Sequence, residues 1–187
     1  MTKDFVSRRP DVVAVELVGG SEKRELELVA YDDSWPVIFL AHQNRLRKAL
    51  GTTEVEVEHI GSTSVPGLAA KPIIDILVTV GDITVEEDYL GPLLSVGYEL
   101  RVREPGHRLV RTSARDVHIH ILQRGDSAID RYLLFRNRLR ADADDRSLYE
   151  ATKSALLGEG FDDMNAYAEA KADVIAAIIA RALASGT

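Results

Sequence analysis

The chain has 187 residues, contains no cysteine, and carries a formal net charge of -7 with a pI near 5.3. This length fits one domain, and the missing cysteine excludes disulfides, thiolate zinc sites and cysteine nucleophiles. The acidic balance argues against broad nucleic-acid binding. Because no apolar run is long enough for a membrane span and the first residues lack the apolar stretch of a secretory signal, we expect a cytoplasmic protein with no membrane partner.

The N-terminal part predicts two strands and a helix. Residues 12–18 and 24–30 are apolar enough for strands and are separated by a glycine-rich turn. The cluster Asp32-Asp33-Ser34, with a proline shortly after it, marks a helix start, and Gly51 marks the end of that helix.

Two further strands flank a loop in the middle of the chain. Residues 53–60 alternate strictly between polar and apolar side chains, which predicts a half-buried strand that carries His59 on its inner face. Residues 73–80 are apolar on both faces apart from one carboxylate, as expected of a central strand. The intervening residues 61–72 predict a loop with one helical turn.

The remainder predicts a short helix, three strands and then helices. The expected ranges are a helix at about 86–95, strands at 97–103, 107–113 and 116–122, and helices at about 127–141, 145–157 and 162–184. The prediction is therefore an α+β fold in one domain over residues 1–187. A mixed sheet with helices on it occupies about 12–123, and a C-terminal helical bundle occupies about 126–184.

The chemistry is concentrated between residues 59 and 76. Asp75 is a lone carboxylate in an apolar strand, where ionisation costs several kcal/mol unless the group is paired or metal-bound. The preceding loop supplies a glycine for close backbone approach, three hydroxyls and a lysine that can contact phosphate, namely Gly61, Ser62, Thr63, Ser64 and Lys71. This pattern predicts an anion-binding site. The alternative for Asp75 is a buried salt bridge to a helix arginine.

The motif HIGSTSVPGL at 59–68, followed by AKPIID at 70–75, resembles the GrpB family of the nucleotidyltransferase superfamily. That family is sometimes fused to dephospho-CoA kinase. Weaker matches, such as the HIH strand at 118–120, extend the resemblance over nearly the whole chain from about residue 28. The resemblance implies a nucleotidyltransferase-like sheet, nucleotide phosphates held near Ser62, and magnesium held by aspartates.

One departure from the superfamily concerns the metal. Its strand carries a second carboxylate two residues after the first, where this chain has Leu77. His118 and His120 alternate with apolar residues on a neighbouring predicted strand and therefore share a face. If a divalent cation, Mg, Mn or Zn, binds, the expected ligands are Asp75, His118 and His120, with His59 as a further candidate, and nitrogen ligands favour a transition metal over magnesium. The alternative is a hydrogen-bonded histidine pair.

Two other residues are ligand candidates. His59 is expected either to contact the ligand or to make a structural hydrogen bond. Arg136 interrupts an apolar helical stripe, so it either extends to solvent or meets an anion.

We expect a nucleotidyltransferase-like protein that binds a nucleotide or a phosphorylated small molecule. Gly61, Ser62 and Thr63 would hold phosphate, with Lys71 and Arg136 balancing its charge. If nucleotidyl or phosphoryl transfer occurs, Ser62 and Asp75 are the catalytic candidates. One alternative is a non-catalytic accessory module that has lost its metal site. A second is a metal-dependent hydrolase that uses the histidine pair.

Overall fold

The computed structural model describes residues 10–20, 27–159, 167 and 169–185. Its sheet has six strands: β1 (Glu16–Leu17), β2 (Glu56–Ile60), β3 (Ile74–Val80), β4 (Tyr98–Glu104), β5 (His107–Thr112) and β6 (Val117–Gln123). Their order across the sheet is β1-β4-β5-β6-β3-β2. The pair β3 and β6 is parallel and the other neighbours are antiparallel, so the sheet is mixed.

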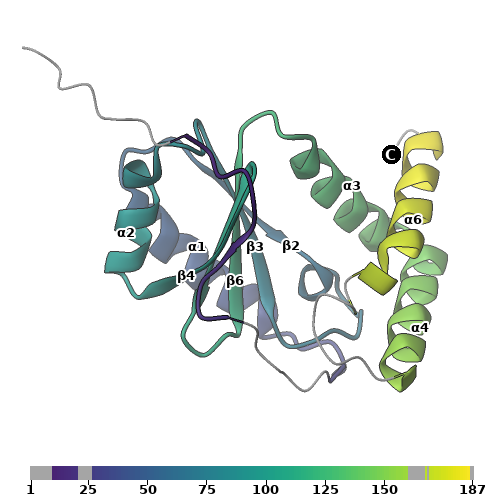
Figure 1. Cartoon of the computed structure of the whole chain (residues 1–187). Coiled ribbons are helices and arrows are strands. Elements are labelled where there is room, and N and C mark those ends of the chain that lie inside the picture. Colours follow the sequence, from purple (N-terminus) through teal and green to yellow (C-terminus); the bar gives the residue numbers. More distant parts are fainter. Residues whose placement is uncertain (1–9, 21–26, 160–166, 168, 186–187) are drawn as a thin grey trace, which may run out of the picture.

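Helices cover both faces of this sheet. They are α1 (Trp35–Leu50), α2 (Leu90–Ser95), α3 (Ser127–Ala141), α4 (Ala143–Glu159) and α6 (Ala172–Ser185), with single 3-10 turns η1 (Ser62–Ser64) and η2 (Glu86–Asp88). Helices α1 and α2 lie on one side of the sheet, and α3, α4 and α6 lie together on the other (Figure 1). The predicted α+β fold with C-terminal helices is confirmed. In the described parts of the chain, every helix is too short or too polar to cross a membrane.

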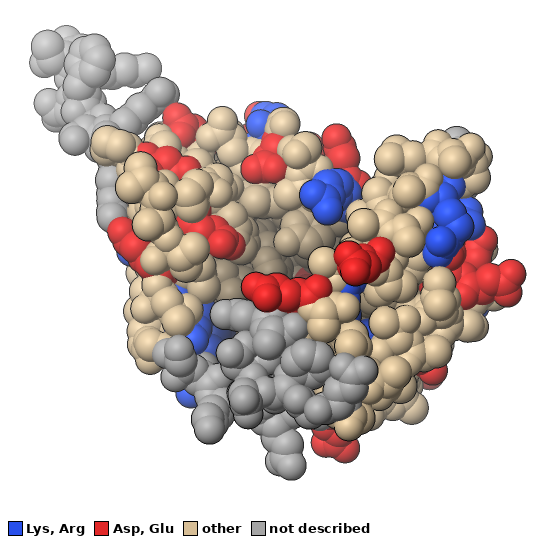
Figure 2. All heavy atoms as spheres, turned by 45° about the vertical axis from the view of Figure 1, so that its right-hand side comes forward, with Lys and Arg blue, Asp and Glu red and all other residues tan. Residues whose placement is uncertain are grey.

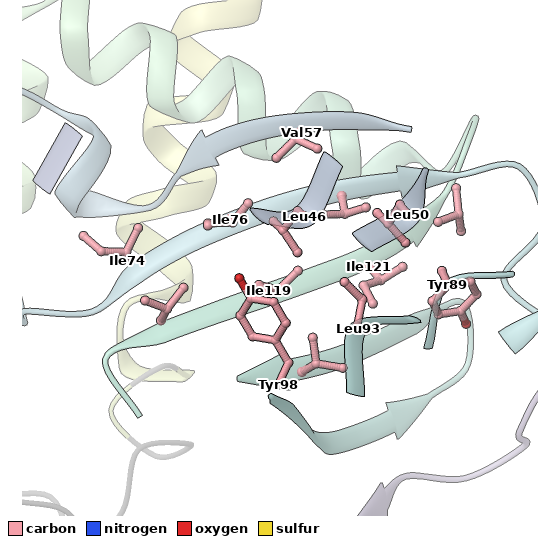
Figure 3. Packing of buried hydrophobic residues seen from close by; sticks show 14 of the residues in the cluster. Leu46, Leu50, Val57, Ile74, Ile76, Tyr89, Leu93, Tyr98, Ile119 and Ile121 are labelled. Atoms are coloured by element: carbon pink, nitrogen blue, oxygen red, sulfur yellow. The ribbon is translucent and has the colours of Figure 1, made fainter. Parts of the chain in front are cut away.

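The main core lies between the sheet and helices α1 and α2. Leu46 and Leu50 of α1 pack with Ile76 of β3 and Ile119 of β6, and Leu93 of α2 closes the same cluster (Figure 3). The helix α1 begins where the Asp32 carboxylate accepts from the Ser34 N–H, and it ends at Gly51, whose φ is 58°. The predicted start and end of this helix are therefore correct.

The register of β3 against its neighbours assigns the polar side chains to faces. In the parallel pair β3 and β6, Asp75 lies beside His118 and Leu77 lies beside His120. Directly paired residues point to the same side of a sheet. Asp75 and both histidines therefore project from the face covered by α3, opposite the main core.

Three predicted elements differ from the structure. Within 12–18 the strand is reduced to Glu16–Leu17, because Val13 and Val15 are exposed and have no sheet to pack on. The predicted strand 24–30 lies partly outside the described residues, and its described part makes a single bridge, Val29 with Ala70. The helix predicted at 86–95 is η2 followed by α2, because Pro92 fits the first turn of a helix but not its interior.

The last predicted helix, 162–184, also differs from the structure. Residues 160–166 and 168 lie outside the described part of the chain. The chain turns at Lys171, and α6 begins only at Ala172. This turn brings Lys171 toward the sheet.

Candidate functional site

A cavity of about 130 Å³ lies where β3 begins, between the sheet and the C-terminal helices. Two hydroxyls, three lysines, one carboxylate and one histidine line it, together with Leu28, Ile73 and Tyr167. The face shown in Figure 2 is hollowed between the sheet and these helices, with Asp and Glu side chains at the rim of the hollow. The cavity is small compared with typical ligand pockets, and it matches a phosphate group better than a whole nucleotide.

Gly61 and Asp75 face each other at the edge of this cavity. Gly61 has a φ of 70°, which disfavours other residues, and a Cβ at this position would lie 2.5 Å from Asp75 Oδ2. The glycine therefore allows the loop to turn directly over the carboxylate. The following turn, η1, is fixed by Ser64 Oγ, which donates to the Gly61 carbonyl at 2.6 Å, and by Thr63 Oγ1, which donates to the Ile73 carbonyl at 3.1 Å.

Asp75 is held by the two histidines of β6. Its Oδ1 lies 3.5 Å from His120 Nε2 and 3.9 Å from His118 Nδ1, and 30% of its side chain stays accessible. Burial alone raises the pKa of Asp75. The hydrogen bond from His120 and the charges of both histidines and Lys171 outweigh burial, so its pKa is lowered and the carboxylate stays ionised. A salt bridge to a helix arginine, the alternative considered for Asp75, is not what holds it.

Three lysines from distant parts of the chain converge on the cavity. Lys71 lies in the loop before β3, Lys153 on α4, and Lys171 at the turn before α6. Lys71 and Lys171 both lie over the ring of Tyr167, with Nζ at 3.5 and 4.4 Å from its centre. Such cation–π contacts orient the ammonium groups.

Lys153 is the most buried of these lysines, with 2% of its surface exposed. Its Nζ donates to Ser62 Oγ at 3.3 Å and to the Ala69 carbonyl. Burial, reinforced by the charge of Lys171, lowers the pKa of Lys153 to about 8. Burial also lowers the pKa of Lys171, and Asp75 opposes that change. An anion in the cavity would offset the free-energy cost of burying these charged ammonium groups.

Of the residues expected in the site, Gly61 and His120 lie against Asp75 without lining the cavity, and three others lie away from it. His59 lies on the opposite face of the sheet, stacked on Phe39 and hydrogen-bonded to Thr63 Oγ1 at 3.1 Å. Burial and the nearby arginines lower the pKa of His59 to about 4, so it is neutral and makes the structural hydrogen bond. Ser64 is buried within η1. Arg136 donates to Glu58 Oε2 at 2.7 Å and to the His59 carbonyl at 2.9 Å, so it joins α3 to β2.

The expected metal centre is not preformed. Asp75, His118 and His120 do lie together. Across the described ranges of the chain, however, no group of three or more His, Cys, Asp or Glu is arranged to hold a metal ion. Leu77, at the position of the superfamily's second carboxylate, is 1% exposed and packs with Ile60 and Leu122. Apolar packing has thus replaced a ligand position.

Sequence reasoning did not place Lys153, Lys171 and Tyr167 in the site. Lys171 does interrupt an apolar helical pattern, which was the available signal in the sequence. Nothing in the local sequence of α4 distinguishes Lys153 from a surface lysine. Its role is visible only because α4 packs over the loop at Ser62.

The fold defines the class to which the protein belongs. The solved structure of a cytoplasmic RNA terminal U-transferase superposes with a TM-score of 0.50 at 18% identity, covering 67% of this chain and 40% of the transferase. At this level of identity the likeness concerns the fold alone. The chain thus has a nucleotidyltransferase-like fold, as the sequence predicted.

Closer relatives identify the family. Residues 25–181 match the model of the family described as GrpB protein, so the chain belongs to the GrpB family. A UPF0157 protein of Streptomyces coelicolor is 61% identical over 182 residues, covering 97% of each chain. The crystal structure of the conserved protein GrpB from Enterococcus faecalis superposes with a TM-score of 0.75 at 34% identity, covering 85% of this chain and 98% of that one.

The predicted link to dephospho-CoA kinase is also present. A protein of Mycolicibacterium paratuberculosis named dephospho-CoA kinase is 31% identical over 175 residues. The match covers 78% of this chain but 43% of that protein, so the similarity concerns a part of it.

Proposed function

We propose that the protein binds a cytoplasmic nucleotide or phosphorylated small molecule through its phosphate groups in this cavity. The observation that carries the proposal is the charge balance of the lining, where three lysines face one carboxylate. Lys71, Lys153 and Lys171 contact the phosphate oxygens, with the Ser62 hydroxyl beside them. Lysine ammonium groups and a serine hydroxyl fit a ligand that presents negatively charged phosphate oxygens.

The size of the cavity indicates how such a ligand lies. About 130 Å³ accommodates phosphate groups, so the remainder of the ligand extends into the open space beyond the cavity. In this proposal a divalent cation, Mg, Mn or Zn, binds together with the phosphate groups of the ligand, because the described residues offer no three-ligand metal site. The resemblance to nucleotidyltransferases in fold makes nucleotides the first ligands to test.

Group transfer is a separate proposal. In it, Asp75 acts as the base that accepts a proton from an attacking hydroxyl, and the lysines neutralise the developing phosphate charge. The buried Leu77 favours a second candidate function, a non-catalytic accessory module that binds the same ligand without turnover. The two differ in whether bound nucleotide is consumed.

A thermal-shift screen tests binding. Nucleoside triphosphates, and coenzyme A precursors as phosphorylated small molecules, are each added with and without Mg²⁺, Mn²⁺ or Zn²⁺. A ligand at about 100 times its dissociation constant stabilises the native state by about 2.7 kcal/mol, which raises Tm by roughly 5 °C or more in a chain of this size. The shift should disappear in Lys153→Met and persist in the matched control Lys48→Met, whose lysine is exposed on α1. A shift that survives Lys153→Met would show that phosphate binds elsewhere.

Product analysis separates the two candidate functions. Under the same conditions, a transferase releases pyrophosphate or nucleoside diphosphate, and Asp75→Asn abolishes this release. An accessory module keeps its thermal shift and leaves the triphosphate intact.

A further inference from the structure

The ring of Tyr167 joins two parts of the cavity that are distant in the chain. Its side chain lines the cavity and is buried, with 1% of the residue exposed. Lys71 Nζ lies 3.5 Å from the centre of the ring, and Lys171 Nζ lies 4.4 Å from it. Both distances are within the range of about 6 Å over which an ammonium group is attracted to an aromatic face. One ring therefore holds two of the three lysines that line the cavity.

The backbone fixes where each of these lysine side chains begins. Lys71 lies in the loop before β3, where its carbonyl accepts from the Ile73 N–H at 2.7 Å. Lys171 lies at the turn before α6, where its carbonyl accepts from the Ile175 N–H at 3.1 Å. A lysine carries its charge on a long flexible stem, so these backbone hydrogen bonds do not by themselves determine the position of the ammonium group. The contact with Tyr167 brings both ammonium groups to one place.

The attraction comes from the face of the ring and not from a charged oxygen. Burial raises the pKa of Tyr167 to about 12, so its hydroxyl stays neutral near neutral pH. The face of an aromatic ring carries partial negative charge and attracts cations, more strongly where water is excluded. Two ammonium groups repel each other, and their shared contact with one ring offsets part of that repulsion. A carboxylate in the same position would instead form ion pairs that an incoming anion has to break.

We propose that Tyr167 is a positioning residue of the cavity, whose ring holds the ammonium groups of Lys71 and Lys171 where a phosphate group meets both. Its contribution to binding is preorganisation, because lysines that are ordered before the ligand arrives do not have to be ordered by it. The effect on affinity rests on the proposed function. The position of the two lysines over the ring does not, because it is a property of the ligand-free protein.

The position of the lysines is measured by NMR without any ligand. The chain has six lysines, so ¹³C-lysine labelling gives a small set of Cε–Hε signals that Lys71→Met and Lys171→Met can assign. Nuclei over the face of an aromatic ring are shifted upfield, so the Hε signals of Lys71 and Lys171 should lie upfield of that of the exposed Lys48. Tyr167→Phe keeps the ring and should keep these shifts. Tyr167→Met removes the ring but fills part of its volume, and should return both signals to the position of Lys48.

Affinity is measured by calorimetric titration with inorganic pyrophosphate, which presents only phosphate oxygens. Tyr167→Phe should bind it as the wild type does. Tyr167→Met should bind it about tenfold more weakly or worse, because the ligand then has to order two lysines. In Lys171→Met, the loss caused by Tyr167→Met should be smaller, because the ring then positions only Lys71. A ring that acted only by packing would cost the same affinity in both backgrounds.

The matched control is Tyr98→Met, which removes a buried tyrosine ring from the main core, where Arg45 lies 4.9 Å from the ring centre. This variant should leave the lysine signals and the affinity for pyrophosphate unchanged.

Three results would overturn the proposal. The first is a wild-type spectrum in which the Hε signals of Lys71 and Lys171 lie at the position of Lys48, a result that requires no variant to fold. The second is a loss of affinity in Tyr167→Phe as large as that in Tyr167→Met, and the third is an equal loss in the two backgrounds. Equal binding of pyrophosphate by the wild type and Tyr167→Met would also overturn it and leave the proposed function intact. If pyrophosphate does not bind the wild type, the proposed function and the effect on affinity both fail, whereas upfield shifts that disappear in Tyr167→Met still establish the position of the lysines.

Discussion

Lys153 gives a prediction about the pH dependence of stability. Its pKa is about 8 in the folded protein against an ordinary value of 10.5. Between these values the unfolded chain holds a proton that the folded chain has released, so the free energy of unfolding rises with pH. The interval from pH 7 to pH 10 covers most of the range between the two pKa values. Over this interval the titration of Lys153 raises the free energy of unfolding by about 2.5 kcal/mol. Lys153→Met should lose this gain.

Urea unfolding at pH 7 and pH 10 measures the effect. Each variant is compared with itself at the two pH values, so the other titrating groups and the lost hydrogen bonds of Lys153 cancel to first order. The wild type and the exposed-lysine control Lys48→Met should show the same change between the two pH values. Lys153→Met should show a change that is more negative by about 2.5 kcal/mol. Equal changes in all three proteins would mean that Lys153 is ordinarily solvated, and the argument for a cationic cavity would lose its most buried member.

Three further substitutions test the geometry of the site. Gly61→Ala places a Cβ against Asp75 at a positive φ, so urea unfolding should show a free energy of unfolding that is lower by about 1–3 kcal/mol, and any nucleotide-induced thermal shift should disappear. An unchanged free energy of unfolding and an unchanged thermal shift would contradict the close approach of Gly61 to Asp75. Leu77→Asp restores the superfamily's second carboxylate inside an apolar cluster, so unfolding followed by circular dichroism should show destabilisation by about 3 kcal/mol or more. A stable variant that binds Mg²⁺ would instead indicate that the metal site can be recovered. Lys171→Met removes one charge-assisted contact, so calorimetric titration with ATP should show binding about tenfold weaker or more; unaltered affinity would place Lys171 outside the site.

The sequence alone determined the elements that depend on local patterns. The cluster Asp32-Asp33-Ser34 and Gly51 gave the bounds of α1, and the range 127–141 coincides with α3. Alternation predicted β2 and β6 to within a few residues, and the apolar run predicted β3. These signals are local because capping and periodicity act between residues near one another in the chain.

The motif block also identified the loop and carboxylate at the centre of the site. Gly61, Ser62, Thr63, Lys71 and Asp75 are brought together as the sequence predicted. They are close in the chain, and the loop that joins them is short, so few arrangements of the fold could separate them. Whether they bind phosphate remains a prediction.

Only the tertiary structure decided which distant side chains share the cavity. Strand alternation placed His59 on the inner face of its strand but did not say whether Asp75 shares that side of the sheet, and the register of β2 against β3 puts the two on opposite sides. The parallel register of β3 and β6 brings His120 to Asp75, and the hairpin of β4 and β5 brings His107 to His120. Lys153 reaches the Ser62 loop through helix packing. Such contacts join residues tens of positions apart in the chain. They are determined by side-chain packing between helices and strands, and no local sequence pattern encodes that packing.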